Sequence, residues 1–176
     1  MADNSRLTIL DRIEGSSFLI IRSAVPVFQR RKLDVQFYKI GLFQENESIV
    51  TLFSRINDQN EAMPKNVGIR KGSDSDLNSG DLRLFLSKLN QLKTLDKIQG
   101  KSYLAIDAAD AVFQQRHQAD LAAYRITLVR ERDSVYVTFA DKDGKPDARG
   151  GPGSLPAFEV ELTAGDLKVL RSHFVR

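Results

Sequence analysis

The chain consists of two similar halves, and this internal duplication limits the possible folds more than any other feature of the sequence. Residues 10–21 (LDRIEGSSFLII) return as residues 95–106 (LDKIQGKSYLAI), with an offset of 85 given by Gly15 and Gly100 (100 − 15 = 85). After a one-residue insertion the offset becomes 86, and six identical pairs follow: Tyr38/Tyr124, Ile40/Ile126, Leu42/Leu128, Glu45/Glu131, Ser48/Ser134 and Phe53/Phe139. A similarity that keeps its register over this length indicates two copies of one structural unit.

Each copy is expected to contain four strands. Short apolar runs bounded by glycine and serine predict the first strand, at residues 16–22 and 101–106. Alternating apolar residues predict a second strand at 38–43 and 124–129 and a third at 49–53 and 135–139, joined by short polar turns as hairpins. A fourth strand is expected at 66–71 and 157–162.

A helix is expected to end each copy. Asn78 and Thr163 each lie three positions before an aspartate, which is the pattern of an N-cap followed by an acidic first turn. Apolar residues at helical spacing follow in both copies: Leu82, Phe85, Leu86 and Leu89 in the first, and Leu167, Leu170 and Phe174 in the second. The predicted fold is therefore α+β, with two tandem ββββα repeats at residues 10–93 and 94–176. Each repeat is an antiparallel four-stranded sheet with one C-terminal helix, and the two pack as one pseudo-twofold domain.

The composition limits where in the cell the protein is expected and which kinds of site it can contain. The sequence has no run of about 18 apolar residues that a membrane span requires, and its first residues lack the pattern of a secretory signal. It has no cysteine, which excludes disulfides and cysteine-ligated metals. We therefore expect a cytoplasmic protein without membrane contact. The formal charge of +3 allows a nucleic-acid partner without requiring one.

One helix covers only one face of a sheet, so the second face of each predicted sheet must meet solvent, a ligand or another protein surface. The apolar pairs shared by the two copies are assigned to the core, and strand alternation then directs the other residues outward. The outward set mixes aromatic and cationic side chains: Phe18, Arg22, Lys39, Phe43, Val50 and Leu52 in the first copy, and Tyr103, Ala105, Arg125, Val129, Tyr136 and Thr138 in the second.

Such a mixture suits single-stranded nucleic acid, because cations contact phosphates while bases stack on aromatic rings. Burial of these residues between sheets or subunits is the alternative explanation. The basic run 29–32, which includes Arg31, and its counterpart near Arg116 could add phosphate contacts or could simply be solvated.

No pattern in the sequence indicates catalysis. The two histidines, His117 and His173, have no carboxylate or second histidine at a metal-binding spacing. The glycine-rich run 150–153 lacks the strand-to-helix context and the Lys-Ser/Thr ending of a phosphate-binding loop. The sequence therefore predicts a protein that is not an enzyme and has no cofactor.

The predicted repeat of four strands and a helix resembles the Whirly and Pur-alpha group of single-stranded nucleic-acid-binding proteins. Residues 99–106 (QGKSYLAI) are similar to the Whirly segment Lys-Gly-Lys-Ala-Ala-Leu, with Gly100, Lys101 and Leu104 matching it directly. Residues 158–170 (FEVELTAGDLKVL) are similar to the last strand and helix of that family. The resemblance implies that the sheets carry single-stranded DNA or RNA on their outward faces and that subunits form a homo-oligomer.

The leading hypothesis from the sequence is a non-enzymatic protein that binds single-stranded DNA or RNA with weak sequence preference. The residues expected to contact nucleic acid are Phe18, Arg22, Arg31, Lys39, Lys101, Tyr103, Arg116, Arg125 and Tyr136. An alternative is a protein-interaction module, a scaffold or inhibitor, that uses the same faces. A third option is a small-ligand sensor with a pocket between the sheets.

Overall fold

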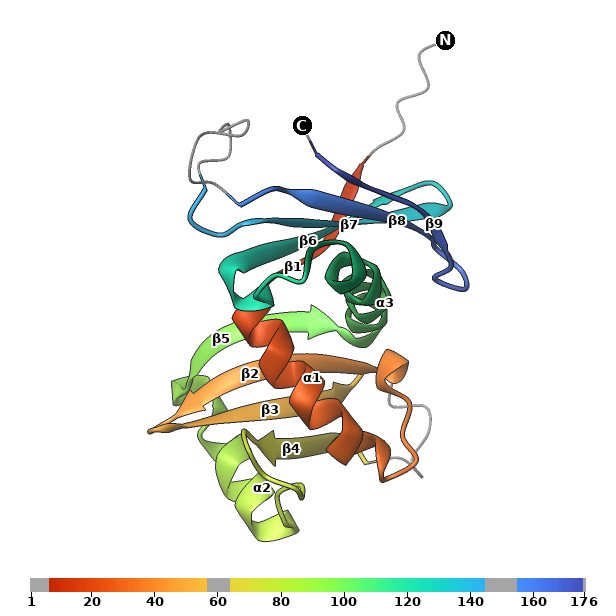
Figure 1. Cartoon of the computed structure of the whole chain (residues 1–176). Coiled ribbons are helices and arrows are strands. Elements are labelled where there is room, and N and C mark those ends of the chain that lie inside the picture. The colour runs from red at the N-terminus through yellow and green to blue at the C-terminus, as the bar shows by residue number, and fades with distance from the viewer. Residues whose placement is uncertain (1–6, 57–63, 145–154, 176) are drawn as a thin grey trace. The chain divides into compact units, whose positions relative to one another are not determined.

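The computed structural model describes residues 7–56, 64–144 and 155–175 and divides the chain into two compact units (Figure 1). One unit consists of residues 17–101, and the other combines residues 1–16 with residues 102–176. The chain therefore passes between the units twice, after residue 16 and after residue 101. The glycine-rich run 150–153 lies outside the described residues.

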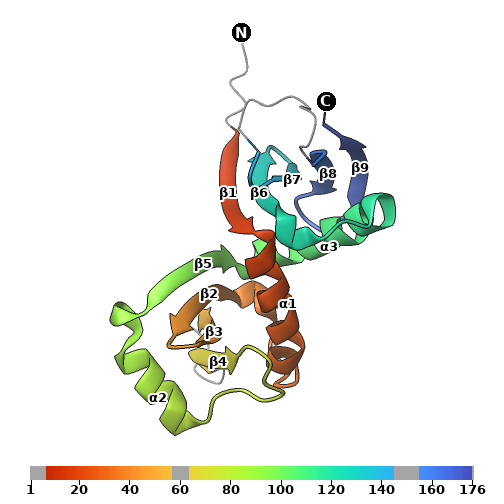
Figure 2. The same cartoon turned by 60° about the vertical axis from the view of Figure 1, so that its left-hand side comes forward.

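The unit of residues 17–101, hereafter the four-stranded unit, contains an antiparallel sheet. Its strand order is β4-β3-β2-β5, and helices lie on both of its faces (Figure 2). The ring of Phe28 on the first helix stacks on Phe53 at 4.2 Å between centroids and meets Tyr38 edge-on at 4.9 Å. The elements are α1 (Gly15–Gln29), η1 (Val35–Phe37), β2 (Tyr38–Glu45), β3 (Ser48–Arg55), β4 (Asn66–Arg70), α2 (Ser79–Ser87), η2 (Leu89–Gln91) and β5 (Lys93–Gln99).

The other, the five-stranded unit, is an antiparallel sheet in the order β1-β6-β7-β8-β9, with one helix on one face (Figure 1). Phe113 on that helix stacks on Phe139 at 4.5 Å and meets Tyr124 edge-on at 5.1 Å, so equivalent positions of the two repeats make the same core contacts. The elements are β1 (Thr8–Glu14), α3 (Gly100–His117), η3 (Leu121–Ala123), β6 (Tyr124–Glu131), β7 (Ser134–Asp141), β8 (Phe158–Thr163) and β9 (Val169–Phe174).

The predicted arrangement of two tandem ββββα repeats is wrong. Residues 16–22 and 101–106 are not strands but the first turns of α1 and α3, which run for 15 and 18 residues. The buried positions of α1 are spaced three or four residues apart, as helix packing requires, and they include Phe18, Ile21, Val25 and Phe28. Leu19, which was assigned to the core, is 39% exposed because it lies on the outer side of this helix.

The prediction of a helix at the end of the second copy is also wrong, although the equivalent helix of the first copy, α2, is present. Asn78 caps α2 by accepting a hydrogen bond from the backbone N–H of Asp81 at 2.9 Å. In the second copy, the hydroxyl of Thr163 donates a hydrogen bond to Oδ1 of Asp166. This bond lies within a turn in which Leu167 has a φ of 56°. The chain then continues as β9, which pairs with β8. The same local start signal thus leads to a helix in one copy and a strand in the other.

The two repeats exchange their first strands. β1 precedes α1 in sequence but pairs with β6 of the second repeat, and β5 precedes α3 but pairs with β2 of the first. The compact units therefore begin and end at different places from the sequence repeats 10–93 and 94–176. Each sheet is therefore completed by one strand that comes from the other repeat.

Glycine is required where each exchanged strand turns into its helix. A Cβ on Gly15 would lie 1.8 Å from the carbonyl oxygen of Leu121, and a Cβ on Gly100 would lie 1.8 Å from the carbonyl oxygen of Val35. Both obstacles are backbone atoms that are fixed by a 3₁₀ turn before the next strand. Only a residue without a side chain fits this close approach.

Candidate functional site

Two of the three aromatic residues predicted to stack on bases are buried. Phe18 has 0% and Tyr103 4% of its surface exposed, because both lie on the inner sides of helices α1 and α3. Their predicted outward orientation followed from the strand assignment and is wrong for the same reason. Ala105 is buried in α3 as well.

The predicted cations on the helices do not form one surface with these rings. Arg22 and Lys101 are exposed on α1 and α3, and Arg116 is exposed near the end of α3. Arg31, just after α1, forms an ion pair with Asp76. The neighbouring Arg30 donates a hydrogen bond to the backbone oxygen of Asp74 at 2.8 Å. The basic run 29–32 therefore holds the segment before α2 in place.

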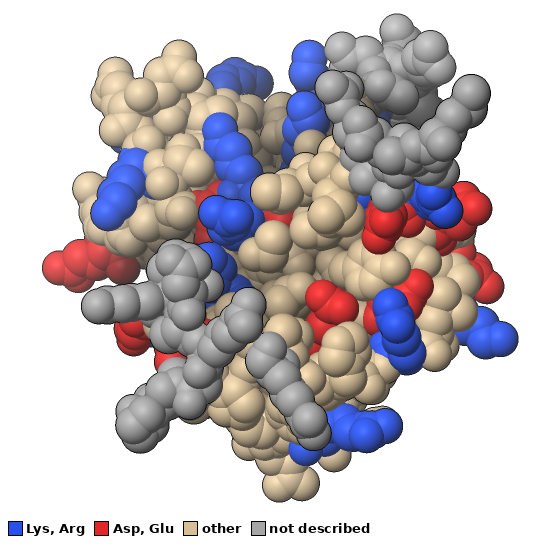
Figure 3. Space-filling view, turned by 90° about the horizontal axis from the view of Figure 1, so that it is seen from above, with Lys and Arg blue, Asp and Glu red and all other residues tan. Residues whose placement is uncertain are grey.

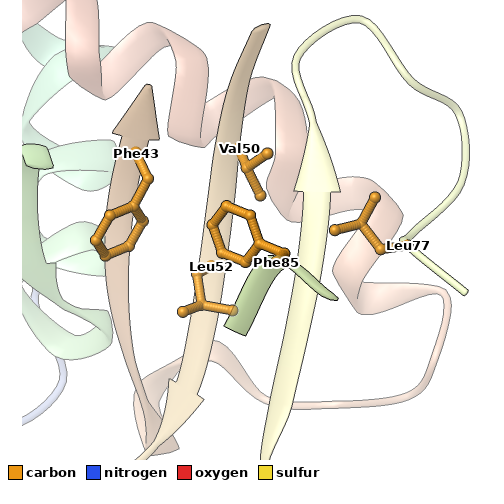
Figure 4. Close-up of a cluster of buried hydrophobic side chains, with 5 residues drawn as sticks. All are labelled: Phe43, Val50, Leu52, Leu77 and Phe85. Atoms are coloured by element: carbon orange, nitrogen blue, oxygen red, sulfur yellow. The ribbon is translucent and has the colours of Figure 1, made fainter. Parts of the chain in front are cut away.

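Helix α2 closes most of the outer face of the four-stranded sheet, which was expected to be open. Figure 4 shows the cluster that it forms there with the sheet, and all five members are buried: Phe43, Val50, Leu52, Leu77 and Phe85. Phe43 and Phe85 meet edge-on at 6.0 Å between ring centroids. Lys39 remains exposed at the end of this face, beside Ser54 and Gln99 in the paired strands.

No helix or strand among the described residues covers the face of the five-stranded sheet opposite α3, and this face is called the open face below. Buried and half-buried residues alternate along β6 as far as Val129, along β7 as far as Ala140 and over the whole of β8, so every second side chain there points away from the core. The middle of this face is a strip of half-buried uncharged side chains, hereafter the central strip, composed of Thr127, Val129, Tyr136, Thr138 and Ala140. Tyr136 and Arg125 are the predicted site residues that lie on the face.

Charged side chains border the central strip in pairs. Arg125 donates from Nε to Oε1 of Glu14 at 2.9 Å on one side. On the other side Glu161 forms an ion pair with Arg171. Oε1 of Glu159 lies 3.8 Å from Nε2 of His173. Figure 3, which looks onto the protein from above Figure 1, shows both basic and acidic side chains on the surface.

Glu161 anchors a hydrogen-bond network that joins three strands. The hydroxyls of Ser134 and Tyr136 donate to its Oε1 at 2.8 and 3.2 Å, and Arg171 approaches from β9. The Ser134 hydrogen bond, followed by the contact with Arg171, holds the pKa of the Glu161 carboxyl below its ordinary value. The same contact with Glu161 raises the pKa of Arg171. Both groups are therefore charged at neutral pH, and the position of Tyr136 is fixed by the network.

The sequence interpretation missed Glu159 and Glu161. The signal was present, because residues 158–162 (FEVEL) alternate between apolar and acidic residues within a strand that was predicted correctly. Applying alternation to this strand, as was done for the other strands, places both carboxylates on the open face.

The described residues contain neither a candidate membrane-spanning helix nor a candidate metal site. No helix in residues 7–56, 64–144 and 155–175 combines the length and apolar content needed to cross a lipid bilayer. The same part of the chain contains no group of three or more histidine, aspartate or glutamate side chains arranged to hold a metal ion.

No protein-family model matches the chain. No curated protein matches it either. Among solved structures, the chain is similar to the crystal structure of a candidate lipoprotein from Clostridium difficile 630, at 14% sequence identity and a TM-score of 0.26. The match covers 88% of this chain and 92% of the other.

Proposed function

We propose that the protein is an interaction module that binds a protein partner on the open face of its five-stranded sheet. The observation that carries the proposal is the central strip, an uncharged surface around Tyr136 with paired charges on both sides. Protein interfaces have this organisation, with charged residues depleted at the centre and polar groups at the rim. Tyrosine is also among the residues that contribute most to binding energy at such centres.

Preorganisation of the face supports the proposal. The hydroxyl of Tyr136 is held by Glu161, and that of Thr138 donates to Oε2 of Glu159 at 3.3 Å. Side chains that are already ordered lose little conformational entropy when a partner binds. The partner that fits this face is a folded protein whose own binding surface is uncharged at its centre.

The charges on this face favour protein over nucleic acid. A single-strand-binding groove needs cations that are available for phosphate and several exposed rings. Here Glu159 and Glu161 lie beside Tyr136 and would repel phosphates, while Arg125 is paired with Glu14. The nucleic-acid hypothesis and the expected homo-oligomer remain predictions, and the experiment below includes an arm for each.

Photo-crosslinking from the central strip tests the proposal. A photoreactive amino acid at Thr127 should give a light-dependent conjugate with one polypeptide in the cells that express the protein. The same group at Arg83, exposed on α2, is the matched control and should not give that conjugate. Thr138→Arg should abolish the conjugate and change the free energy of unfolding by no more than about 0.5–1.5 kcal/mol, because this side chain is outside the core and its hydroxyl makes one hydrogen bond, to Glu159.

Three results would overturn the proposal. They are equal conjugates from both positions, a conjugate that is insensitive to Thr138→Arg, and a conjugate with nucleic acid in place of protein. A conjugate between two copies of the chain would identify the partner as a second subunit. Titration of labelled single strands over a salt series measures nucleic-acid binding directly, and its affinity should fall steeply with salt if phosphates are contacted.

A further inference from the structure

Strand β9 forms one edge of the five-stranded sheet, and part of its backbone points away from the sheet. It is the last strand of its sheet, and no strand among the described residues pairs with its outer side. The backbone N–H of Val175 donates to the carbonyl of Ala157 at 2.9 Å, which fixes the alternation of the β8–β9 ladder. By that alternation Arg171 and His173 direct their N–H and C=O groups toward β8, while Ser172 and Phe174 direct theirs outward.

The two faces of β9 present different exposed side chains to any strand that pairs with its outer edge. Arg171 and His173 project onto the open face, and 63% and 51% of their side-chain surfaces are exposed. The opposite, α3-facing side of the strand ends in Phe174, which packs edge-on against Phe158 at 5.0 Å and is still 44% exposed. A strand placed beside β9 would therefore meet the Arg171 guanidinium and the His173 imidazole on one face and an aromatic ring on the other.

Strand β8, which pairs with the inner edge of β9, has a sequence that complements it. Its sequence FEVEL places Glu161 opposite Arg171 and Glu159 opposite His173, with apolar residues between them on the core face. Arg171 donates its Nε to Glu161, and a guanidinium carries five N–H donors, so the same group can also contact a carboxylate on its other side.

The other sheet edges lack this property. Strand β1 carries Asp11 and Glu14 together with Arg12, so its charges are mixed. Strand β5 carries Asp96 among its lysines. The outer edge of β4 is bridged by Ile69 and Asp76. Strand β4 has no carboxylate either, but its single cation, Arg70, is paired with Glu45. Among the described edge strands, β9 is therefore the one that combines an unbridged outer edge with an arginine and no carboxylate of its own.

We infer that β9 is a binding site for an acidic extended peptide, which adds to the sheet antiparallel as a sixth strand. The peptide alternates apolar residues with glutamate or aspartate, as β8 does. Its acidic residues lie opposite Arg171 and His173 in non-hydrogen-bonded pairs, where facing side chains are closest. The apolar residues between them donate to and accept from the backbone of Ser172 and Phe174. Main-chain hydrogen bonds supply affinity and the alternate side chains supply specificity.

A labelled peptide with the sequence of residues 156–163 (PAFEVELT) is the probe, and fluorescence anisotropy with the full-length protein is the assay. We expect saturable binding, and a version with lysine in place of both glutamates should not bind. Arg171→Glu should weaken binding roughly tenfold or more, as expected for removing a charge pair at a binding surface.

Backbone changes test the geometry. Ser172→Pro removes an N–H that points outward and leaves the β8–β9 hydrogen bonds intact, so it should abolish binding while Ser172→Ala should not. Methylation of the peptide nitrogen at the position of Val160 tests the same contact without changing the protein, and methylation at the position of Glu161 is its matched control. The first should prevent binding and the second should not.

Several outcomes would overturn the inference. Undiminished binding to Ser172→Pro would mean that the peptide displaces β8 instead of adding to the edge. Equal binding of a polyglutamate peptide would show charge attraction alone, and equal effects of the two methylated peptides would exclude strand pairing. Because these experiments concern the edge and the crosslinking concerns the central strip, failure of one proposal leaves the other standing.

Discussion

Replacing Gly15 by alanine should destabilise the five-stranded unit, although the same change in a helix normally has the opposite effect. Alanine stabilises helices relative to glycine by roughly 0.5–1 kcal/mol, because glycine loses more backbone freedom on folding. Here the new Cβ would lie 1.8 Å from the carbonyl oxygen of Leu121 and 2.9 Å from that of Tyr124. The structure therefore predicts a change whose sign differs from the one that helix propensity predicts.

The magnitude follows from the displacement that the methyl group requires. A carbon and a carbonyl oxygen in contact are about 3.3 Å apart, so the backbone around Leu121 must move by roughly 1.5 Å. Overpacking usually costs about 1–3 kcal/mol, and a rigid backbone neighbour favours the upper limit. For a chain of this size about 3 kcal/mol corresponds to a melting temperature lower by roughly 6–12 °C.

Calorimetry measures the change, and hydrogen exchange followed by mass spectrometry locates it. The loss of protection should be concentrated in β6 and β7, and Gly100→Ala should cause the equivalent loss in β2 and β3, since its Cβ meets the carbonyl oxygen of Val35. Gly165→Ala is the matched control, because no atom lies within 4 Å of its Cβ, and it should stay within about 0.5 kcal/mol of wild type. A Gly15→Ala protein that melts at or above the wild-type temperature would refute the reasoning.

Three other measurements test the fold. Phe18→Ala should lower the free energy of unfolding by about 3–5 kcal/mol in urea titrations, as a core truncation does, whereas an exposed ring would give almost no change. Glu161→Gln should destabilise the protein at pH 7, and the difference should vanish as the pH falls through the lowered pKa of this carboxyl, because the folded state favours the carboxylate. A difference that persists at pH 2 would contradict this. Fragments 1–90 and 91–176 each lack a strand of their sheet, so we expect sedimentation analysis to show them folded only as self-paired dimers or as a 1:1 complex. A folded monomer of either fragment would contradict the strand exchange.

The helices α1 and α3 were mistaken for strands, although their spacing was visible in the repeat. A run of apolar residues as short as 18–21 fits either structure, so it does not decide between them. The pairs that the offset of 85 aligns further along were also buried, at Ala24/Ala109 and Phe28/Phe113. Together with Phe18/Tyr103 and Ile21/Ile106 they give spacings of three, three and four, which a strand cannot place on one face. The helical period is therefore present in both copies, but it is recognisable only over a window longer than two helical turns.

The exchange of first strands could not be inferred from the sequence. β1 and β5 occupy equivalent positions in the repeats, and either could have paired within its own copy or with the other. Local sequence specifies that a strand forms and which side is apolar, whereas the choice of partner depends on packing over the whole chain. The one local trace is the glycine at each transition, Gly15 and Gly100, and it indicates a close approach without identifying the neighbour.

The open face itself results from a divergence after the shared Gly-Asp-Leu motif. In the first copy Phe85 follows, and α2 packs it onto Phe43 and closes the outer face of the sheet. In the second copy the residue aligned with Phe85 is Leu170, within a run that pairs with the edge of β8. The equivalent segment therefore extends the second sheet instead of covering it. Both proposed surfaces, the central strip and the outer edge of β9, exist because this one segment changed from helix to strand, so replacing residues 166–175 with the α2 sequence should remove both.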